Sequence, residues 1–464
     1  MLTKLDSNPV RVWDESRLAV NTYEMIQSGN YIVPTFEHQP DMWNLKPPFM
    51  LWMQIICIKA VGIGELAFRL PSAIAGILCC LLVFGMVKKV TRTAEIGFMA
   101  AIVLASTPGY VDYHLTRSGD YDSLLIFLNF LGLYFFYIYT ENQKNIFYYL
   151  FFLILGVAVL TKSIVGLMFL PGILLYSIYS NMFIVLAKNK HTYIGLGLFF
   201  LIAGSYYITR EHLNPGYLAA VQENEVGGRF NNTIESHSGS FLFYIKLLLQ
   251  EQITPWYLMA LAGLVLGIFS PEKTIQKSTM FISLVFVTFL LTISLAQTKL
   301  TWYSGPLYPL VAFLTGIFLY HLLQFFKSNT FIGSYIKEPI LYCTVFIILL
   351  LTPYKDITIK SFNHEEHPWG KDDYHTSFVL QQALKNKIDI SNTKIVYDNY
   401  KAHLLIYVDI LNDRNQNISF ANINDLKSGD KVLIEEGDPY EKLKKAYSFQ
   451  YLYQWNKTIL LEIL

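Results

Sequence analysis

Apolar segments of about twenty residues recur along the chain, separated by short polar connections, and they constrain its fold more than any other feature. A helix of that length crosses the hydrocarbon core of a bilayer. Hydrophobic residues make up 53% of the 464 positions and charged residues only 15%, against about 25% in soluble domains. The sequence therefore predicts an all-α polytopic membrane protein.

The apolar pattern indicates about ten transmembrane spans. They cover approximately residues 71–88, 95–111, 123–140, 146–160, 163–182, 192–208, 254–270, 280–296, 305–324 and 339–353. A further apolar stretch, "KPPFMLWMQIICIKAVG", is short and contains Lys59. We expect it to form a helix in the membrane interface, with a re-entrant segment as the alternative.

The connections between these spans fall into two alternating sets. One set is short and holds more Lys and Arg than Asp and Glu, which predicts that it faces the cytoplasm. Its basic residues are Lys88, Lys89, Arg92, Lys144, Lys188, Lys190, Lys273, Lys277, Lys327 and Lys337. Almost every unusual polar residue falls in the opposite set, so we expect the working face to lie outside the cytoplasm. That set contains residues 1–70, 112–122, 161–162, 209–253, 297–304 and the tail from residue 354.

This alternation places the N-terminus outside, although no signal peptide or leading helix precedes Asp14. We therefore expect a first span to be missing from this chain. The alternative is an N-terminus that crosses the membrane unaided. The predicted location is a bacterial inner membrane, with the active site and the tail facing the periplasm.

The tail differs in composition from the rest of the chain, which predicts two domains: residues 1–353 in the membrane and residues 354–464 outside it. In the tail, short β-branched runs alternate with amphipathic helical pieces, a pattern typical of a small α/β domain. The runs are 394–397 and 431–435, and the helical pieces are 400–411 and 439–447. The tail carries no nucleotide-binding loop or nucleophile motif, so we interpret it as an accessory or recognition module.

Charge and cysteine content exclude several classes of protein. The net charge is +1, so no overall field attracts nucleic acid. The four cysteines lie inside apolar runs without CxxC or CxxH spacing, which indicates core positions and no readable zinc site or disulfide framework.

Two residues of the first outer segment are candidates for chemistry. Asp14 stands where an amphipathic helix can begin, and Gly29 stands where it can end. Asp14 either caps that helix or is a carboxylate fixed beside the membrane, as a general base requires. Lys46 precedes two prolines, which hold the backbone extended. Its ammonium group either reaches toward lipid headgroups or binds a phosphate.

The stretch "HLTRSGDYD" concentrates charge at a predicted membrane edge. The helix dipole can accommodate Asp120 and Asp122 at the start of the next span, but it does not account for His114 and Arg117 in the same short loop. Charges at such an edge are costly, and they mark a functional site by default.

Two further outer connections contain polar candidates. Arg229 and His237 lie in a glycine-containing loop that is longer than most, and they are candidate contacts for a phosphate or a sugar; a solvated loop is the alternative. Lys299, Trp302 and Tyr303 follow in "LAQTKLTWYSG". Aromatic belts explain the two rings, whereas a lysine with a tyrosine hydroxyl could also hold a lipid phosphate.

The outer face thus combines carboxylates with cations, the mixture needed to transfer a sugar from a lipid phosphate. A carboxylate would activate an acceptor hydroxyl. Cations, with a divalent metal ion held by carboxylates as an option, would stabilise the departing phosphate.

Seven motifs in order resemble the dolichyl-phosphate-mannose-protein mannosyltransferase-like family of C-type membrane glycosyltransferases, which includes the bacterial aminoarabinose transferase of lipid A. The motifs are "WDESRLAVNTYEMIQSGNYIVP", "LKPPFMLWMQ", "FRLPSAIAGIL", "RSGDYDSLL", "LTKSIVGLMFLPG", "QENEVGGRF" and "TKLTWYSGPLYPL". The resemblance covers residues 11–325. It implies a C-type glycosyltransferase fold, a polyprenyl-phosphate sugar donor, an active site at the outer face and inversion at the sugar carbon.

The resemblance also implies roles for individual residues. Asp14 is similar to the catalytic carboxylate, with Glu15 beside it, and Asp122 is similar to an acidic residue that orients the acceptor or binds metal. A metal site, if present, would therefore use Asp14 and Asp122. Five residues are expected near the donor phosphate, namely Lys46, Arg17, Arg117, Lys299 and Tyr303. His114, Asp120, Arg229 and His237 are expected to contact substrate. Leu45 departs from the glutamate that relatives often have at this position.

We therefore expect a hexosyl or pentosyl transferase that acts on a lipid, glycan or protein acceptor. The main alternative is a transporter or flippase of a lipid-linked or small solute. Such proteins tend to have internal repeats and broken helices near the midplane, and the sequence contains no convincing repeat. A non-catalytic assembly subunit, with the tail as its docking surface, is a third interpretation.

Overall fold

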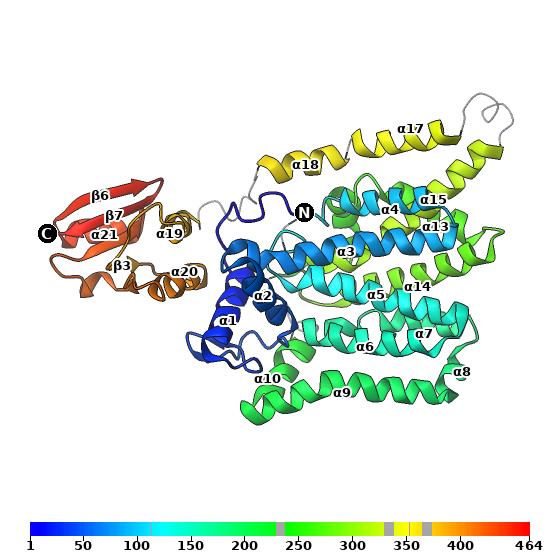
Figure 1. The fold of residues 1–464 in the computed structure, drawn as a ribbon, viewed down its shortest axis with the longest axis horizontal. Coiled ribbons are helices and arrows are strands. Elements are labelled where there is room, and N and C mark those ends of the chain that lie inside the picture. Colours follow the sequence, from blue (N-terminus) through cyan, green and yellow to red (C-terminus); the bar gives the residue numbers. More distant parts are fainter. Residues whose placement is uncertain (113, 229–236, 329–337, 352, 364–373) are drawn as a thin grey trace. The chain divides into compact units, whose positions relative to one another are not determined.

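The computed structural model describes residues 1–112, 114–228, 237–328, 338–351, 353–363 and 374–464 (Figure 1). The chain forms two compact units. Unit 1 consists of Met1–Thr3, Met42–Met53 and Arg69–Asn363, and unit 2 consists of Lys4–Asp41, Gln54–Phe68 and His364–Leu464.

This division differs from the predicted boundary at residue 354. Residues from the N-terminal segment, including Val10 and Val20, share one hydrophobic core with tail residues such as Leu404 and Leu433. The N-terminal segment buries its apolar side chains among those of the tail, so it belongs to the same compact unit although the two are far apart along the chain.

Unit 1 is helical. Its helices are α3 (Glu65–Thr91), α4 (Ala94–Ala105), α5 (Tyr121–Asn142), α6 (Asn145–Lys162), α7 (Leu170–Tyr179), α8 (Phe183–Lys188), α9 (Lys190–Leu213), α10 (Tyr217–Val221), α12 (Phe243–Leu247), α13 (Tyr257–Ile268), α14 (Lys273–Leu295), α15 (Tyr308–Ser328), α17 (Glu338–Leu351) and α18 (Pro353–Asn363). The 3₁₀ turns η1 (Ser163–Leu167) and η4 (Thr301–Leu307) and the π turns η2 (Gln222–Gly228) and η3 (Leu248–Gln252) interrupt them. Two helices are divided between the units: α2 (Phe49–Val61) begins in unit 1 and ends in unit 2, and the first four residues of α3 belong to unit 2.

Within the described residues, seven helices are long and apolar enough to cross a membrane, or eight if the bent pair Phe243–Gln252 and Tyr257–Ile268 forms one span. The predicted class, a helical membrane protein with a small C-terminal sheet domain, is confirmed. Each of the ten predicted spans contains a helix, but α4 has only 12 residues and α7 only 10. Pro108 and Gly109 follow α4, and the turn η1 precedes α7, so neither apolar run is helical throughout.

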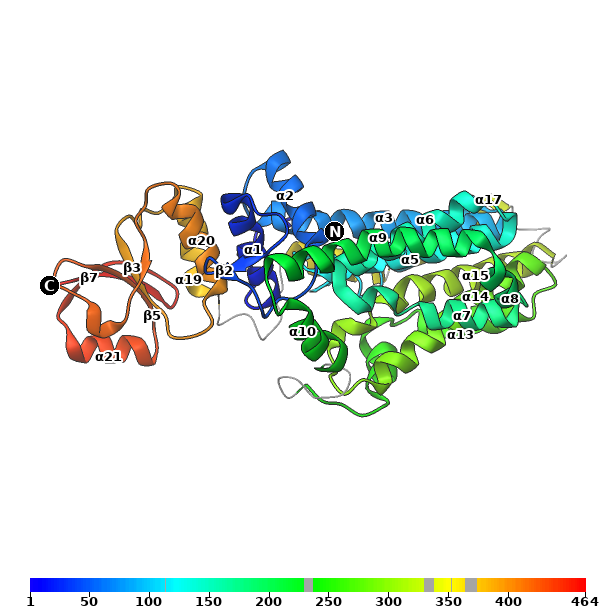
Figure 2. The ribbon, with the colours of Figure 1, turned by 90° about the horizontal axis from the view of Figure 1, so that it is seen from below.

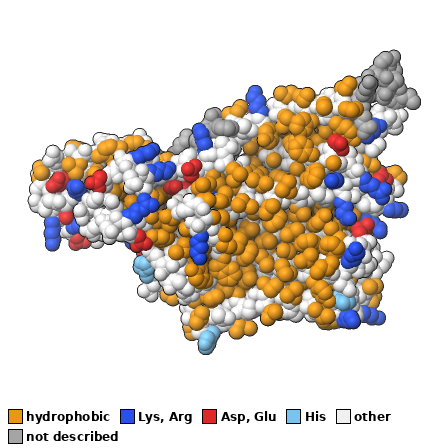
Figure 3. Space-filling model, in the orientation of Figure 1, with side chains coloured by type: hydrophobic (Ala, Val, Ile, Leu, Met, Phe, Trp, Pro, Cys, Tyr) orange, Lys and Arg blue, Asp and Glu red, His pale blue; other side chains and the backbone are white. Residues whose placement is uncertain are grey.

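The long helices of unit 1 lie side by side, α5 on α6, α6 on α9 and α13 on α15 (Figures 1 and 2). Apolar side chains cover the flank of this bundle, and Lys and Arg gather at the end where α3 and α5 finish (Figure 3). That end carries the connections that the charge pattern predicts on the cytoplasmic side. The opposite end holds the starts of α5 and α15 and the end of α6.

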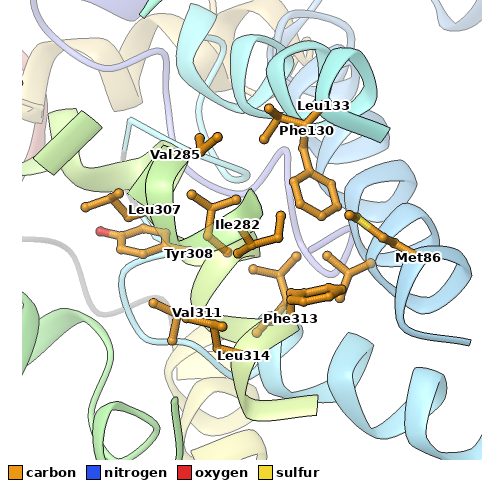
Figure 4. Close-up of a cluster of buried hydrophobic side chains, with 14 of the residues drawn as sticks. Met86, Phe130, Leu133, Ile282, Val285, Leu307, Tyr308, Val311, Phe313 and Leu314 are labelled. Atoms are coloured by element: carbon orange, nitrogen blue, oxygen red, sulfur yellow. The ribbon is translucent and has the colours of Figure 1, made fainter. Parts of the chain in front are cut away.

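The core of unit 1 includes side chains of α3, α5, α14 and α15. Met86, Phe130, Ile282, Tyr308 and Phe313 point toward one another there (Figure 4). Lipid tails are as apolar as these side chains, so membrane helices depend on close packing for their association. A Cβ atom at Gly263 of α13 would lie 1.9 Å from the carbonyl oxygen of Leu314 on α15, so only glycine permits this approach.

Unit 2 joins α1 (Asp14–Ser28) to an α/β layer. The short pair β1 (Thr35–Phe36) and β2 (Gln39–Pro40) follows α1; the tail contains α19 (His375–Leu384), β3 (Thr393–Val396), α20 (Ala402–Asn412), β4 (Ser419–Phe420), η6 (Ile423–Asp425), β5 (Lys431–Glu435), α21 (Asp438–Ala446), β6 (Phe449–Trp455) and β7 (Thr458–Ile463). The predicted strands and helices of the tail are therefore confirmed.

The tail strands form one five-stranded sheet in the order β4-β3-β5-β7-β6. β3 is parallel to β4 and β5, whereas β7 is antiparallel to β5 and β6. One face of the sheet packs on α19 and α20, and α21 covers the other (Figure 2). Alternating strand residues make this possible, since Ile395 faces the first core and Val396 the second.

Replacing Gly263 with alanine should destabilise unit 1 by about 1–3 kcal/mol, because the added methyl group must push α13 away from the backbone of α15. The measurement is the melting temperature of the purified protein in detergent. Gly204→Ala in α9 is the control, because no described atom lies within 4 Å of a Cβ at that position. Equal melting temperatures for both variants would refute this packing argument.

Candidate active site

The start of α5 carries a polar cluster, defined here as His114, Asp120, Asp122, Lys162 and Tyr303. Asp120 is the N-cap of α5 and accepts a hydrogen bond from the backbone N–H of Tyr121 at 2.6 Å. Its second oxygen lies 2.6 Å from Nδ1 of His114. The predicted helix start thus falls at these carboxylates, where the positive end of the helix dipole stabilises negative charge.

Lys162 is the closest partner of Asp122. The ammonium group of Lys162 donates to both carboxylate oxygens of Asp122, at 2.7 and 2.6 Å. Asp122 is 3% exposed and Lys162 6% exposed, so both charges are withdrawn from solvent. A carboxylate and an ammonium group buried together neutralise each other, whereas either one alone would be costly at this depth.

Aromatic rings enclose the polar cluster. The indole of Trp302, in η4, stacks on His114 with 3.6 Å between ring centroids and 20° between planes. The ammonium group of Lys162 lies 5.6 Å from the ring centroid of Tyr303. The connection after α14 therefore packs its aromatic rings against His114 and Lys162.

Asp120 is held as an anion by its neighbours. Burial by itself would raise the pKa of Asp120, but the hydrogen bond with His114 and the charge of Lys162 outweigh burial and lower it. The hydrogen bond from the Tyr121 backbone acts in the same direction. The cluster thus contains a lasting negative charge beside an imidazole.

A second group of polar side chains surrounds Lys46. Its ammonium group lies 3.8 Å from a carboxylate oxygen of Glu225 and 5.6 Å from the ring centroid of Tyr121. The hydroxyl of Tyr121 donates to Asn44, and the amide of Asn44 donates to it at 2.9 Å. Tyr121 directly precedes Asp122, so this group adjoins the polar cluster along the chain.

The hydroxyl of Tyr217 fixes the backbone next to Lys46, because it donates to the carbonyl of Leu45 at 2.7 Å. Tyr217 in turn lies beneath the guanidinium of Arg210, 5.1 Å from its ring centroid. Leu45 therefore contributes its backbone carbonyl to this group.

Two predicted phosphate ligands are used for other contacts. The ammonium group of Lys299 donates to the carbonyls of Ile293, Ser294 and Ala296 at 3.0, 2.6 and 2.6 Å, which uses all three of its protons to cap α14. Burial lowers the pKa of Lys299. Arg117 donates to the carbonyls of Met1 and Thr3 at 3.2–3.4 Å.

Arg229 and His237 are the two candidate contacts predicted in the long outer loop. Arg229 lies outside the described residues. The carbonyl of His237 accepts from the backbone N–H of Lys299 at 2.9 Å, which ties the end of this loop to the connection after α14.

In unit 2, α1 carries Asp14, Glu15 and Arg17. Trp13 is the N-cap and, within the described residues, no side chain caps the helix there, so the alternative in which Asp14 caps this helix is wrong. Asp14 is the exposed first residue, and Gly29 ends the helix as predicted with φ 68°. Glu15 is buried and accepts from the backbone N–H of Arg11 at 2.8 Å.

Arg17 is held by a bidentate ion pair. Its Nε and Nη2 donate to the two oxygens of Asp41 at 2.8 and 2.7 Å. The guanidinium also lies 4.3 Å from the ring centroid of Phe36 and interacts electrostatically with Tyr400. Burial opposes the charge of Arg17, but these partners outweigh burial and raise its pKa. This arrangement makes Arg17 a positioning residue within unit 2.

The helix α20 of the tail supports α1. Tyr23 on α1 hydrogen-bonds a carboxylate oxygen of Asp413, and the backbone N–H of Val10 donates to the hydroxyl of Tyr407 at 2.9 Å. The same hydroxyl donates to Glu65. A tail residue thus helps to fix both chain segments that unit 2 takes from the N-terminal region.

Sequence reasoning missed Lys162 and Asp41 as site residues. A signal existed for Lys162, because a lysine at the end of an apolar run on the outer side requires a carboxylate partner, and Asp122 is predicted at the same membrane edge. No sequence pattern identified Asp41 as the partner of Arg17, since 24 residues separate them.

The metal site that would use Asp14 and Asp122 stays a prediction. The two residues belong to different units. Both oxygens of Asp122 already accept from the ammonium group of Lys162, which supplies the positive charge that a metal would bring. A metal ion at Asp122 would therefore have to displace a buried, paired cation.

Comparison with known proteins supports the resemblance expected from the motifs. Residues 45–208 match the family described as dolichyl-phosphate-mannose-protein mannosyltransferase. An uncharacterized protein of Aquifex aeolicus is 22% identical over 317 residues, covering 68% of this chain and 60% of its own length. An undecaprenyl phosphate-alpha-4-amino-4-deoxy-L-arabinose arabinosyl transferase of Aeromonas hydrophila is 26% identical over 336 residues, covering 71% of this chain and 60% of its own length.

The fold is similar to a solved structure, that of ArnT from Cupriavidus metallidurans bound to undecaprenyl phosphate. The TM-score is 0.70 at 14% identity, covering 98% of this chain and 94% of that one. The predicted C-type glycosyltransferase fold is therefore confirmed. The chain spans about three fifths of the length of the two curated relatives above.

Replacing Lys162 with glutamine should destabilise unit 1 by about 3–5 kcal/mol, because it leaves the carboxylate of Asp122 buried without a counter-charge. The double variant Asp122→Asn, Lys162→Gln should recover most of this loss. Thermal unfolding in detergent measures both effects. Lys277→Gln is the control, since its ion pair with Glu141 is exposed at 3.8 Å and should contribute under about 1 kcal/mol. A double variant no more stable than Lys162→Gln would contradict the pairing.

Asp409 on α20 should make the stability of unit 2 depend on pH. Burial raises its pKa to about 6, with the carboxylates of Glu24, Asp413 and Glu37 adding to the shift and His38 opposing it. In the folded protein the carboxyl of Asp409 keeps its proton up to about pH 6, whereas in the unfolded chain it loses the proton near its ordinary pKa of about 4. The free energy of unfolding therefore falls as the pH rises from about 4 to about 6.

We expect Asp409→Asn to melt at a higher temperature than the unmodified protein at pH 7.5, with a smaller advantage at pH 4.5. Asp398→Asn, at an exposed position in the same unit, is the matched control and should show no such pH-dependent gain. An equal gain at both pH values would rule out titration of Asp409.

Proposed function

We propose that this chain, which resembles the mannosyltransferase family over residues 45–208 and shares its fold with an undecaprenyl-phosphate-bound transferase, is an integral-membrane glycosyltransferase. In this proposal it moves a hexosyl or pentosyl group from a polyprenyl-phosphate donor to a lipid, glycan or protein acceptor. The proposed location is a bacterial inner membrane, with chemistry at its periplasmic face.

One observation carries this proposal: carboxylates and cations are buried together at one end of a helical membrane bundle. Asp120, Asp122 and Lys162 are each at least nine-tenths buried there, and Lys46 adjoins them through Tyr121. Charges are too costly at a membrane edge to be retained for stability alone, since an apolar replacement would serve the fold as well.

The proposed reaction is a single displacement. The carboxylate of Asp14, with Glu15 beside it, accepts the proton of an acceptor hydroxyl as that oxygen attacks the anomeric carbon of the donor sugar. The bond between this carbon and the phosphate oxygen breaks, and its electron pair leaves with polyprenyl phosphate. A displacement of this kind inverts the configuration at the sugar carbon.

Lys46 is the proposed cation for the departing phosphate. Its Nζ lies 3.8 Å from the carboxylate oxygen of Glu225, farther than a hydrogen bond. The ammonium group can therefore exchange this contact for a hydrogen bond with a phosphate. Tyr303 and Arg117 remain candidate contacts for the phosphate, and His114 and Asp120 for the sugar. Lys299 and Arg17 are assigned to the scaffold, because carbonyl groups and Asp41 already occupy their donors.

The proposal predicts that Asp14→Asn lowers transfer by about 10²–10⁴-fold, the usual contribution of a general base. The assay uses membranes containing the protein, a polyprenyl-phosphate sugar with radiolabel in the sugar, and extracted envelope acceptors. Asp438→Asn is the matched control, because Asp438 is likewise an exposed carboxylate at the start of a helix, α21.

Two outcomes would overturn the assignment. Unchanged transfer by Asp14→Asn at normal expression would exclude Asp14 as the base. Movement of the labelled donor across sealed vesicles by purified protein, without any transfer of sugar, would instead identify a flippase.

A further inference from the structure

Trp13, which immediately precedes Asp14, is unusually placed for a tryptophan. It is 59% exposed, although most tryptophans of folded proteins bury the greater part of their ring. Its backbone lies at φ 74° and ψ −119°, a region that bulky side chains rarely adopt and that costs about 1–3 kcal/mol. A residue that is both strained and exposed contributes little to stability, so its retention requires another explanation.

Tyr400 supports one face of the Trp13 indole. The two rings stack with 4.7 Å between centroids and 7° between planes. Tyr400 comes from the tail, just before α20, so the stack joins two distant segments of unit 2. The indole is therefore held flat on one side, and its exposed surface remains open for a ligand.

The supporting ring is itself fixed. The hydroxyl of Tyr400 interacts electrostatically with the guanidinium of Arg17, and Arg17 is held on Asp41 by two hydrogen bonds of 2.8 and 2.7 Å. A platform held in this way needs little ordering when a ligand binds, which lowers the entropic cost of binding.

The surroundings of the indole select the chemistry of the ligand. A lipid tail would need a wide apolar surface, but the next residue along the chain is the exposed Asp14, and the charges of Asp14 and Arg17 both act on the supporting Tyr400. A cationic ligand would meet the guanidinium of Arg17. A sugar ring fits an aromatic face beside a carboxylate, because its C–H face can lie on the indole while its hydroxyls donate to that carboxylate.

We propose that Trp13, backed by Tyr400, binds a sugar ring of the acceptor, so that the acceptor is a carbohydrate. This inference rests on the proposed role of Asp14. The Cα atoms of consecutive residues are about 3.8 Å apart, so a ring held on Trp13 presents its hydroxyls beside the carboxylate that removes the proton. Arg17 and Tyr400 are positioning residues in this arrangement.

Binding can be tested without any assay of transfer. The full chain is labelled with 5-fluorotryptophan and reconstituted in lipid nanodiscs, and the resonance of Trp13 among the seven tryptophans is assigned with Trp13→Phe. The probes are chitobiose and sorbitol, an open-chain polyol that offers hydroxyls without a ring face.

We expect chitobiose to shift the Trp13 resonance in a saturable way and sorbitol to leave it unchanged. Tyr400→Ala should abolish the saturable shift. Equal responses to both probes, or a Trp13 resonance that responds to headgroup composition and not to saccharide, would refute the proposal and would identify Trp13 as a membrane anchor.

The acceptor KM and the donor KM then show whether Trp13 acts on acceptor binding alone. Trp13→Ala should raise the acceptor KM by about tenfold or more, equivalent to about 1.4 kcal/mol, while the donor KM stays within about twofold. Trp13→Phe should restore part of the loss, and Tyr400→Phe, which keeps the stack, should have a smaller effect than Tyr400→Ala. Tyr451→Ala, which removes an exposed aromatic from β6 of the same unit, is the control and should change neither constant.

The possible failures are distinguishable. Transfer by the unmodified protein with an unchanged acceptor KM in Trp13→Ala would reject the sugar platform and leave the glycosyltransferase intact. A lack of transfer by the unmodified protein to any acceptor would reject the proposed function, and the fluorine measurement would still decide whether Trp13 binds a sugar.

Discussion

The cost of placing charge at the edge of a hydrocarbon layer controls the architecture of unit 1. An isolated carboxylate at that depth would favour its protonated form or unfold its surroundings, so each one must find a partner nearby. Asp122 finds Lys162 across α5 and α6, and Asp120 finds His114 and the backbone of α5. The pairings require the start of α5, the end of α6 and the 3₁₀ segment η4 to converge. The polar cluster therefore fixes the geometry of this end of the bundle.

Unit 2 solves a different problem, which is how to hold a short amphipathic helix in place. α1 buries Ala19 and Val20 among tail residues, and hydrogen bonds to Tyr407 and Asp413 fix its position. A helix of 15 residues is marginal on its own in water, so most of its stability must come from such packing. The tail is therefore part of the support for Asp14 and Arg17, in addition to any role in recognition.

Local sequence signals predicted the helices and strands. They did not predict which side chains pair when the partners are far apart along the chain. The end of α1 at Gly29, the helix start at Asp120 and the strands of the tail follow from capping residues and alternation. Lys299 illustrates the limit. Its charge and location predicted a phosphate ligand, but its three protons go to carbonyls at the end of α14, a fact that depends on the path of the backbone. Arg17 was likewise placed correctly on α1. Its pairing with Asp41 could not be predicted, because it depends on the path of the chain after α1.

The hydrogen bond between Val10 and Tyr407 joins residues 397 positions apart, and it has a consequence for biosynthesis. Ribosomes add about 5–20 residues per second, so the segment around α1 must wait tens of seconds after its synthesis before its partner emerges. During that interval the bundle can insert, while the apolar face of α1 remains uncovered. The nascent protein is thus a natural client for a chaperone, and any premature stop codon would leave an inserted bundle whose helix α1 never acquires its support.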